Sequence, residues 1–245
     1  MNILLINPPI RLRRPPYFHP IGLASVAAAL RNAGHQVHIW DINAERENTS
    51  APVGDFGLIG ISGLITTFGY VRKLMPALRQ TYPGVPIVLG GGGFTSAPNV
   101  YIETLKPDYG VIGEGEYAAV EVADAIEREH ATPQLWVGGP VRDLDDYPPP
   151  AYDLLDMDAY LKVVKYAKRA DREAAFLATR GCPFACNYCY HIFGQGVRYH
   201  SMERVLAEME LLKSEYGAGA LLIADECFTA RKDFVKELCA QMIER

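Results

Sequence analysis

The sequence has few cysteines, no excess of one charge and no long apolar run, and each shortage excludes a class of protein. Five cysteines among 245 residues, an odd number, make a poor disulfide framework. The formal net charge is only −5 with both signs interspersed, so no basic face indicates a nucleic-acid partner. No apolar run approaches the roughly 18 residues of a membrane span, and the N-terminus lacks a signal peptide. We therefore expect a cytoplasmic protein without a membrane span, built from about two domains.

The first part of the chain alternates short apolar strands with amphipathic helices. Strands are predicted at 3–6, 36–40, 57–62, 86–89 and 108–112, and helices at 21–32, 68–82 and 118–129. This alternation predicts an α/β fold with a parallel sheet covered on both faces. Right-handed crossovers give a doubly wound, Rossmann-like domain in flavodoxin-like order. Such sheets bind ligands beyond the carboxyl ends of their strands.

The pattern breaks between residues 132 and 171. Pro148, Pro149 and Pro150 cannot continue a strand or helix interior, and Asp143 and Asp145 make the stretch acidic. A connector wrapping between domains and a plain surface linker both fit. We expect a first domain at 1–131, a connector at 132–171 and a second domain at 172–245.

The pattern of the second domain predicts the beginning of a parallel (β/α) barrel. Strands are predicted at 174–179 and 220–224, each followed by a helix, at 202–216 and 232–245. Two strand–helix units cannot close a barrel or bury its core well. The barrel is therefore expected to be partial and the domain incomplete.

A loop with three cysteines follows the first strand of this second domain. Cys182, Cys186 and Cys189 form a CxxxCxxC pattern. Three thiolates on a short loop can reach three irons of one cubane, leaving the fourth iron without a protein ligand. A structural zinc site needs four ligands, so zinc remains an alternative if His191 is the fourth. Cys227 and Cys239 stand apart and are expected to act as small hydrophobes in a strand end and a helix.

The pattern CxxxCxxC, with Tyr188 before its last cysteine, resembles the radical S-adenosylmethionine (SAM) superfamily. The resemblance implies a 4Fe-4S cluster held by the three cysteines and SAM bound to the open iron. It also implies one-electron cleavage of SAM to a 5′-deoxyadenosyl radical, fed by an external electron donor of flavodoxin or ferredoxin type. Tyr188 corresponds to the aromatic residue beside the cluster and the adenine.

An acidic pair follows the next predicted strand. Asp225 and Glu226, in the sequence DECFT, are similar to an acidic pair in related sequences, which implies a carboxylate that meets the SAM ammonium group. A solvated strand end is the alternative. Arg198 resembles a recurrent arginine after the cluster loop, and the sequence assigns it no role.

Small residues follow three strands of the first domain and resemble the cobalamin-binding domain of methionine synthase and related mutases. That resemblance implies a slot for the nucleotide tail of cobalamin, where glycine lets the backbone approach closely and Ser62 offers a short hydrogen-bonding group. A different nucleotide site or a simple turn is the alternative. The residues concerned are Ser62, Gly63 and Leu64, then Gly90 and Gly91, then Gly113, Glu114, Gly115 and Glu116.

One motif of the mutases is missing. They carry DxHxxG after the first strand, where the histidine binds cobalt from below, whereas residues 7–16 here read NPPIRLRRPP. The lower axial ligand is therefore not expected to be a histidine of this loop. His19 lies nearby in sequence and is expected to be a solvated or capping histidine.

Taken together, the chain resembles the cobalamin-dependent class of radical SAM enzymes from about Asn2 to Met242. The resemblance implies methyl transfer to an unactivated carbon or phosphorus centre of a small-molecule substrate. An oxidative cyclase, similar to magnesium-protoporphyrin monomethyl ester cyclase, and a truncated fragment that binds cobalamin without turning SAM over are the alternatives. A methylthiotransferase is disfavoured because no cysteine precedes Cys182.

Overall fold

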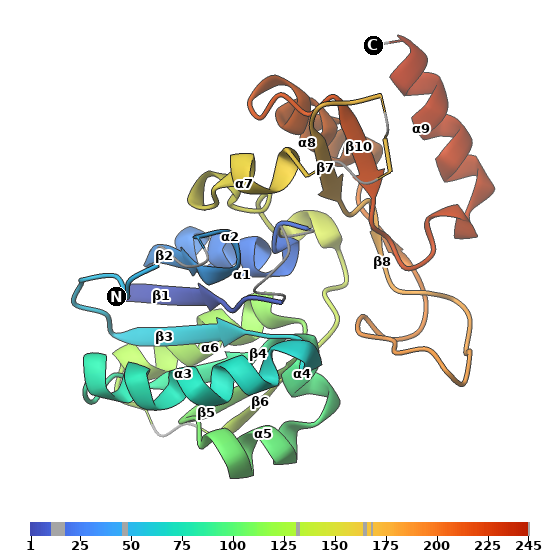
Figure 1. The fold of residues 1–245 in the computed structure, drawn as a ribbon. Helices are drawn as coiled ribbons and strands as arrows, with labels where there is room; N and C mark the ends of the chain where they lie inside the picture. The colour runs from blue at the N-terminus through green and yellow to red at the C-terminus, as the bar shows by residue number, and fades with distance from the viewer. Residues whose placement is uncertain (11–17, 46–48, 131–132, 164–165, 168, 245) are drawn as a thin grey trace. The chain divides into compact units, whose positions relative to one another are not determined.

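The computed structural model describes residues 1–10, 18–45, 49–130, 133–163, 166–167 and 169–244. The chain divides into two compact units (Figure 1). The first comprises Met1–Pro16, Pro20–Gly139 and Pro148–Asp156, and the second comprises Tyr17–His19, Pro140–Tyr147 and Met157–Arg245. The described residues include no helix that is both long and apolar enough to cross a membrane.

The first unit is built on a six-stranded parallel sheet. Its strand order is β2-β1-β3-β4-β5-β6, with every neighbouring pair parallel. This confirms the doubly wound fold and its flavodoxin-like order. In this order β2 lies on one side of β1, and β3 to β6 follow one another on the other side. The strands are β1 (Asn2–Asn7), β2 (Gln36–Asp41), β3 (Leu58–Ser62), β4 (Ile87–Gly90), β5 (Tyr109–Gly113) and β6 (Leu135–Gly138).

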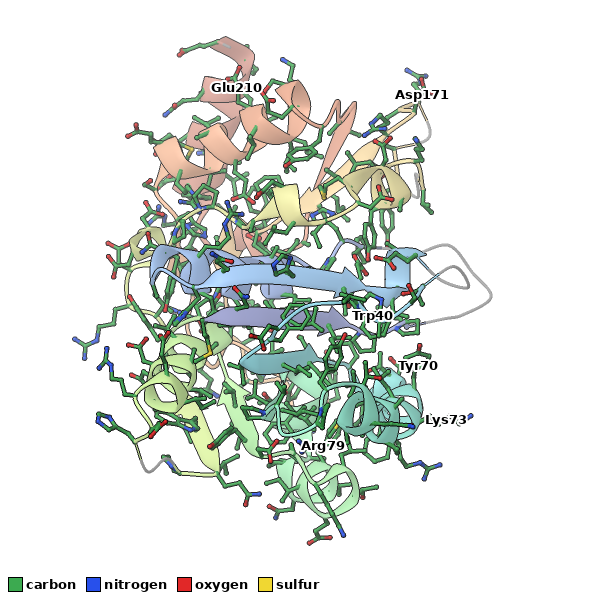
Figure 2. The ribbon with its side chains drawn as sticks, turned by 90° about the vertical axis from the view of Figure 1, so that its left-hand side faces the viewer. Trp40, Tyr70, Lys73, Arg79, Asp171 and Glu210 are labelled. Atoms are coloured by element: carbon green, nitrogen blue, oxygen red, sulfur yellow. The ribbon has the colours of Figure 1, made fainter. Side chains whose placement is uncertain are left out.

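Helices cover both faces of this sheet, and alternate strand residues enter two separate cores. Helices α1 (Ile21–Asn32) and α6 (Gly115–Glu127) bury apolar residues with Ile3 and Leu5. Helices α3 (Phe68–Thr81) and α5 (Pro98–Leu105) do the same on the other face with Leu4. Figure 2 shows the labelled residues Tyr70, Lys73 and Arg79 along α3. Burying apolar surface on both faces is what makes these strands nearly continuous hydrophobic runs.

Several elements of the first unit were not predicted, among them the short helix α2 (Ile42–Glu45). Strand β6 lies inside the expected connector, and helices α4 (Gly91–Ser96) and α5 occupy residues expected to form a loop. Helix α4 forms although it begins with three glycines, because Phe94 is 0% exposed and packs into the core. A Cβ on Gly110 would lie 2.1 Å from the Phe94 ring. Tertiary packing here outweighs the low helix propensity of glycine.

The second unit contains one parallel β-α-β unit and a final helix. Strands β7 (Glu173–Phe176) and β10 (Ala220–Ile223) pair in parallel, connected through α8 (Met202–Ser214), and α9 (Lys232–Glu244) follows. The two expected strand–helix units are therefore present. The predicted strand 174–179 is shorter than expected, because Thr179–Arg180 forms a separate strand, β8, antiparallel to β9 (Arg198–Tyr199).

The interpretation of residues 132–171 as a plain surface linker is wrong. Besides β6, this stretch contains helix α7 (Met157–Leu161), and Tyr152 and Tyr160 are almost fully buried. Its acidic part binds within the second unit: Asp145 accepts hydrogen bonds from the Ser201 backbone N–H and contacts the His200 ring at 2.8 Å. Although burial alone would raise the pKa of Asp145, the bonds from Ser201 and His200 lower it. The domain boundaries at 131 and 171 stay predictions.

Candidate cofactor sites

The loops that follow β3 and β4 are bonded to each other at the carboxyl edge of the first sheet. The Gly63 backbone N–H donates to the Gly90 carbonyl at 3.3 Å, and the Gly93 N–H donates to the Gly63 carbonyl at 2.9 Å. Ser62 pairs with Gly90 across the two strands. The structure thus brings together four of the predicted cofactor-binding residues: Ser62, Gly63, Gly90 and Gly91.

Gly91 and Gly93 are required at this edge by the protein's own backbone. Gly91 has φ of +83°, and a Cβ there would lie 2.8 Å from Ser62 Oγ and 2.9 Å from the Gly63 carbonyl oxygen. A Cβ on Gly93 would lie 2.7 Å from the Leu64 carbonyl carbon. The resemblance implied that glycines here make room for a ligand. In this structure the close approach at Gly91 and Gly93 serves the loop after β3, which fixes the shape of the edge.

Two residues that sequence reasoning missed complete this edge. The Thr95 hydroxyl of α4 accepts a hydrogen bond from the Gly113 N–H at 3.1 Å, which ties the end of β5 to α4. The Tyr101 hydroxyl of α5 donates to the Leu64 carbonyl at 3.4 Å. Neither lies in a motif, so only the tertiary arrangement identifies them.

The residues predicted to bind cofactor after β5, Gly113 to Glu116, do not all lie at the open edge of the sheet. Gly113 joins the edge, whereas Glu114 and Glu116 are buried, at 7% and 3% exposure. Both have interaction partners within the chain. A Cβ on Gly115 would lie 3.1 Å from Val26 of α1, so this residue allows α6 to pack against α1. In this structure residues 114–116 therefore contribute mainly to the packing of α6 against α1 and not to the open edge of the sheet.

Apolar side chains are exposed beside these bonded loops. Leu64 is 47% exposed and Ile65 is 62% exposed. Both lie directly after the Ser62–Gly63 turn, and Ile65 begins the single helical turn η2 (Ile65–Thr67). The edge therefore offers a ligand apolar surface next to backbone held in a fixed conformation.

The loop after β1 is described only in part, because residues 11–17 lie outside the described residues. Its beginning is anchored: Asn7 donates to Asp41 at 2.7 Å, and the Ile10 N–H donates to Asn43 at 3.1 Å. The expectation for His19 is wrong. His19 is 4% exposed and packs edge-on against Tyr160, with ring centres 6.2 Å apart, so it is a core residue of the second unit.

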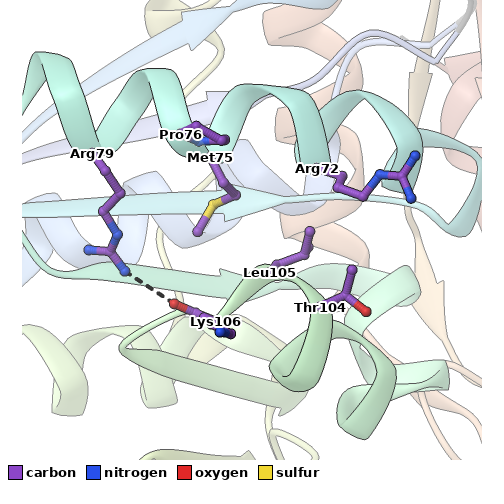
Figure 3. Close-up of a pocket in the computed structure, with 7 residues that line it drawn as sticks. All are labelled: Arg72, Met75, Pro76, Arg79, Thr104, Leu105 and Lys106. Carbon is purple, nitrogen blue, oxygen red and sulfur yellow. Dashed lines mark hydrogen bonds between the residues drawn. The ribbon is translucent and has the colours of Figure 1, made fainter.

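A surface pocket of the first unit lies away from the predicted residues. It is formed between α3 and α5 by Arg72, Met75, Pro76, Arg79, Thr104, Leu105 and Lys106 (Figure 3). Arg79 is already engaged there, bonding Asp108 at 2.7 Å and the Lys106 carbonyl at 3.3 Å. These contacts hold the ends of α3 and α5 together, so Arg79 has a structural role.

In the second unit, the three-cysteine loop is closed by the short ribbon of β8 and β9. Within it, the Gly196 N–H donates to the Cys182 carbonyl at 3.1 Å, and the Cys189 N–H donates to the Cys186 carbonyl at 3.1 Å. Cys186 and Cys189 are exposed, and Cys182 is half-buried. The closed ribbon therefore presents three thiols from one loop at the carboxyl end of β7.

The spacing of the sulfur atoms bears on the zinc alternative. Within the described residues, three potential metal-ligand atoms lie within 4.8 Å of one another in His35, Asp124 and Glu127 only. There the Met1 ammonium group already donates to Glu127 at 2.9 Å. The cysteine sulfurs do not form such a group. A single ion binds thiolates at about 2.3 Å and gathers them closely, whereas a cubane places each thiolate on a different iron. A donor set of three thiolates on one loop fits the cluster.

Arg198 supports the loop from one side, which gives it the role that the sequence left open. Its guanidinium donates to the Val141 carbonyl and to the Phe193 carbonyl within the loop. Arg180, before the first cysteine, lies over the Phe193 ring at 5.3 Å. The two arginines therefore fix the far part of the cysteine loop.

Asp225 is half-buried at the end of β10 and is hydrogen-bonded there. Its carboxylate accepts hydrogen bonds from the Ala178 N–H at 2.8 Å and from the Thr179 hydroxyl at 2.7 Å. Burial raises the pKa of Asp225 above its ordinary value, against the effect of these bonds. The residue fastens the end of β10 to the segment that leads into Cys182.

The next two residues lie against the cysteine loop. Burial raises the pKa of Glu226, while the His191 ring and the Ile192 N–H oppose the rise. Burial also raises the pKa of Cys227, and so does the Cys182 thiol. Cys227 is therefore not the isolated small hydrophobe that we expected. Cys239 is exposed on α9, so the same expectation is wrong for it.

Comparison with known proteins gives consistent matches. The family described as B12 binding domain matches residues 9–123. An uncharacterized methyltransferase of Pyrococcus horikoshii, PH0819, is 30% identical over 95% of this chain and 55% of its own length. The anaerobic magnesium-protoporphyrin IX monomethyl ester cyclase of a Synechocystis species is 29% identical over 99% of this chain and 53% of its own length.

A solved structure shares the fold of the whole chain. The radical SAM methyltransferase TsrM from Kitasatospora setae, solved with cobalamin and a [4Fe-4S] cluster bound, matches all of this chain and 51% of its own, with a TM-score of 0.73 and 19% identity. The chain thus spans about half the length of the relatives that it matches.

The close approach at Gly91 gives a first prediction. Gly91→Ala forces a non-glycine residue into the left-handed region, which alone costs about 1–2 kcal/mol, and adds the clash with Ser62. Both tryptophans, Trp40 and Trp136, lie in the first unit, so their fluorescence during urea unfolding reports on that unit. We expect the free energy of unfolding of Gly91→Ala to be lower than that of wild type by at least this amount.

The matched control for Gly91 is Gly22→Ala. A Cβ on Gly22 of α1 meets nothing within 4 Å, so this variant is expected to keep or slightly increase the unfolding free energy. Equal losses in the two variants would show that the edge does not depend on the absence of a side chain at Gly91.

The half-buried carboxylate of Asp225 gives a second prediction. Because its pKa is raised in the folded chain, the stability it contributes is present below the unfolded pKa of about 4 and is lost as pH rises through the folded pKa. Asp225→Asn removes this titration and keeps an acceptor for the Ala178 N–H. The stability of the variant relative to wild type should therefore rise between pH 4 and pH 7.

The measurement is urea unfolding at several pH values, followed by circular dichroism. Glu203→Gln, on the exposed first turn of α8, serves as the carboxylate control. A stability difference between Asp225→Asn and wild type that stays constant with pH would contradict the assignment.

Proposed function

We propose that the protein is a cobalamin-dependent radical SAM methyltransferase using a 4Fe-4S cluster, SAM and cobalamin, a proposal supported by its similarity to PH0819 and TsrM. The observation that carries the proposal is the pairing, in one chain, of a B12-binding domain with three thiols on a single closed loop. Neither alone specifies this chemistry, since B12-binding domains and cysteine loops each occur in other proteins.

In this proposal Cys182, Cys186 and Cys189 hold the cluster. When bound, such a cluster supplies the electron that cleaves SAM. The chain's own contribution is to keep the loop in place: β8 and β9 close it, and Arg198 fixes its far part through two backbone carbonyls. Tyr188 is 89% exposed and therefore free to contact a nucleoside ligand beside the loop.

We assign different roles to Asp225 and Glu226, the two residues of the predicted acidic pair. Asp225 is committed to Ala178 and Thr179, so we assign it to positioning the cluster loop. Glu226 is exposed and lies near His191. We propose that Glu226 is the carboxylate that meets the ammonium group of SAM, as a charge-assisted hydrogen bond.

Cobalamin is assigned to the carboxyl edge of the first sheet, beside Ser62, Gly63, Leu64, Gly90 and Gly91. This is where an open parallel sheet binds its ligands. The exposed apolar surface of Leu64 and Ile65 suits a large, partly apolar ring system. Residues 7–16 contain no histidine, so this loop would supply none to bound cobalamin.

Methyl transfer to a small molecule is favoured over cyclisation by the relatives. PH0819 carries a methyltransferase name and TsrM is a methyltransferase, whereas the Synechocystis relative is a cyclase. Cyclisation is therefore the second candidate. The choice depends on the substrate, which we expect to be bound in large part by the region that the relatives have beyond the matched length. We further propose a flavodoxin- or ferredoxin-type electron donor and a cytoplasmic location.

The third prediction tests the proposed chemistry. The chain, made without oxygen and reconstituted with iron and sulfide, is given SAM and a strong reductant. Wild type is expected to release 5′-deoxyadenosine, and the triple variant Cys182→Ala, Cys186→Ala, Cys189→Ala is expected to fall to background. Cys239→Ala, which removes an exposed cysteine of α9, is the control and should retain the release.

The products separate the candidates. Transfer of a methyl group from SAM leaves S-adenosylhomocysteine, so its formation with cobalamin present supports methyl transfer, and deoxyadenosine without it favours the cyclase. Bound cobalamin with no SAM cleavage at all would overturn the proposal in favour of a cobalamin-binding fragment.

A further inference from the structure

A buried histidine and two carboxylates converge at the edge of the first sheet where its strands begin. His35 directly precedes β2, and Asp124 and Glu127 lie in the last turn of α6. One ligand atom of each residue lies within 4.8 Å of the other two. The loops assigned to cobalamin follow the carboxyl ends of the strands, so this group is separate from them.

The end of α1 fixes the position of His35. The Gly34 N–H donates to the Arg31 carbonyl at 3.0 Å, and the His35 N–H donates to the Leu30 carbonyl at 3.1 Å. Gly34 has φ of +92°. This is the Schellman pattern, in which a helix ends on a glycine in the left-handed region. The backbone of His35 is therefore anchored directly before β2 begins.

The His35 ring has one nitrogen with a partner and one without. Its side chain is only 3% exposed. Nδ1 contacts the Met1 ammonium group at 3.3 Å. Nε2 is buried and has no hydrogen-bond partner among the described residues, and Asp124 Oδ1 lies 3.5 Å from it. A buried polar atom without a partner destabilises a fold, so a ligand that binds Nε2 removes this cost.

The two carboxylates keep oxygens for a further cation. Asp124 and Glu127 are three residues apart and therefore share one face of α6. Asp124 Oδ2 accepts from Arg128 at 3.1 Å, and Glu127 Oε1 accepts from the Met1 ammonium group at 2.9 Å. Asp124 Oδ1 and Glu127 Oε2 are left, and the latter lies 3.8 Å from His35 Nδ1. Because the two side chains are 36% and 50% exposed, they can rotate toward an ion without repacking the core.

We propose that His35 Nε2, Asp124 and Glu127 bind a divalent transition metal ion such as zinc, with water at the fourth position. An imidazole nitrogen beside carboxylate oxygens suits such an ion, whereas Ca²⁺ and Mg²⁺ prefer oxygen ligands alone. Zinc binds nitrogen and oxygen in a tetrahedron at about 2.0–2.2 Å, which places two ligand atoms about 3.4 Å apart. The 3.5 Å between Nε2 and Asp124 Oδ1 fits this spacing.

The ion would join the turn after α1 to the end of α6. These two helices pack in one core on the same face of the sheet, and the ion would fasten them where the strands begin. Its position away from the cofactor edge gives it a stabilising role. The site goes beyond the proposed function and does not depend on it.

The fourth prediction uses Zn²⁺ as the probe. The parent is the full chain with Cys182→Ala, Cys186→Ala and Cys189→Ala, so that loop thiols add nothing to the count. After equilibrium dialysis near neutral pH, we expect one zinc ion per chain by elemental analysis. Loss of even an outer-shell partner weakens metal binding about 10–100-fold, so Asp124→Asn and His35→Gln should each weaken zinc binding at least that much.

Matched controls exist on the same elements. Glu121→Gln removes an exposed carboxylate of α6, and His38→Gln removes an exposed histidine of β2. Both should bind zinc like the parent. Zinc should also raise the urea midpoint of the parent, followed by tryptophan fluorescence of the first unit, because an ion that binds only the folded chain stabilises it. Asp124→Asn should lose this rise. Asp124 lies on the surface of α6, so this variant keeps the test intact if His35→Gln does not fold.

The wild-type chain gives a check that needs no variant. Cobalt(II) bound by His35 and the two carboxylates absorbs without the thiolate-to-metal charge-transfer band that cobalt at the cysteine loop would show. Cobalt bound only with that band overturns the proposal. So does a parent chain that retains no zinc, or equal zinc affinity in the parent, Asp124→Asn and His35→Gln.

These failures are distinguishable from failure of the proposed function. None of them touches the cysteine loop or the cofactor edge, so the cluster and cobalamin assignments would stand. Zinc retained through His35 in a chain that binds neither iron nor cobalamin would support this site while contradicting the proposed function.

Discussion

Parallel pairing of strands is the constraint on which both candidate sites depend. In a parallel sheet all carboxyl ends lie at one edge, so residues far apart in sequence meet there. In the first unit this brings Ser62 after β3 beside Gly90 of β4. In the second unit it brings the segment before Cys182, after β7, beside Asp225, after β10. Both units thus collect their functional residues in the same physical way.

The glycines of the first unit show how this constraint acts at the level of single atoms. Two loops bond backbone to backbone at 2.9 Å between Gly93 and Gly63, and that spacing leaves no room for a side chain. Their first role in the structure is therefore to build the edge. A ligand at this edge meets a preformed surface, which reduces the ordering that binding would otherwise require.

Much of this fold was accessible from the sequence because hydrophobic periodicity and strand–helix alternation are strong signals. Strands β1 to β5, the helices α1, α3 and α6, and the flavodoxin-like order were predicted, and the cysteine loop was placed correctly after β7. Strand β6 was missed because its exposed edge position leaves Leu135 and Val137 outside the core, at 37% and 75% exposure. Such a short, half-exposed strand has little periodic pattern to detect.

The remaining misses come from tertiary contacts that no local pattern encodes. Helix α4 depends on the burial of Phe94, and His19 is buried against Tyr160 despite its proline-rich surroundings. Arg198 has a role only because Val141 and Phe193 come within its reach.

The central claim is that one chain binds both an iron–sulfur cluster and cobalamin. It is tested most directly by counting metals in the chain, made without oxygen and supplied with iron, sulfide and hydroxocobalamin, after unbound material is removed. We predict about four irons, with matching sulfide, held by the cysteine loop, one cobalt at the first unit, and the absorption of both cofactors. Stoichiometric zinc in place of iron, or no retained cobalt, would contradict it.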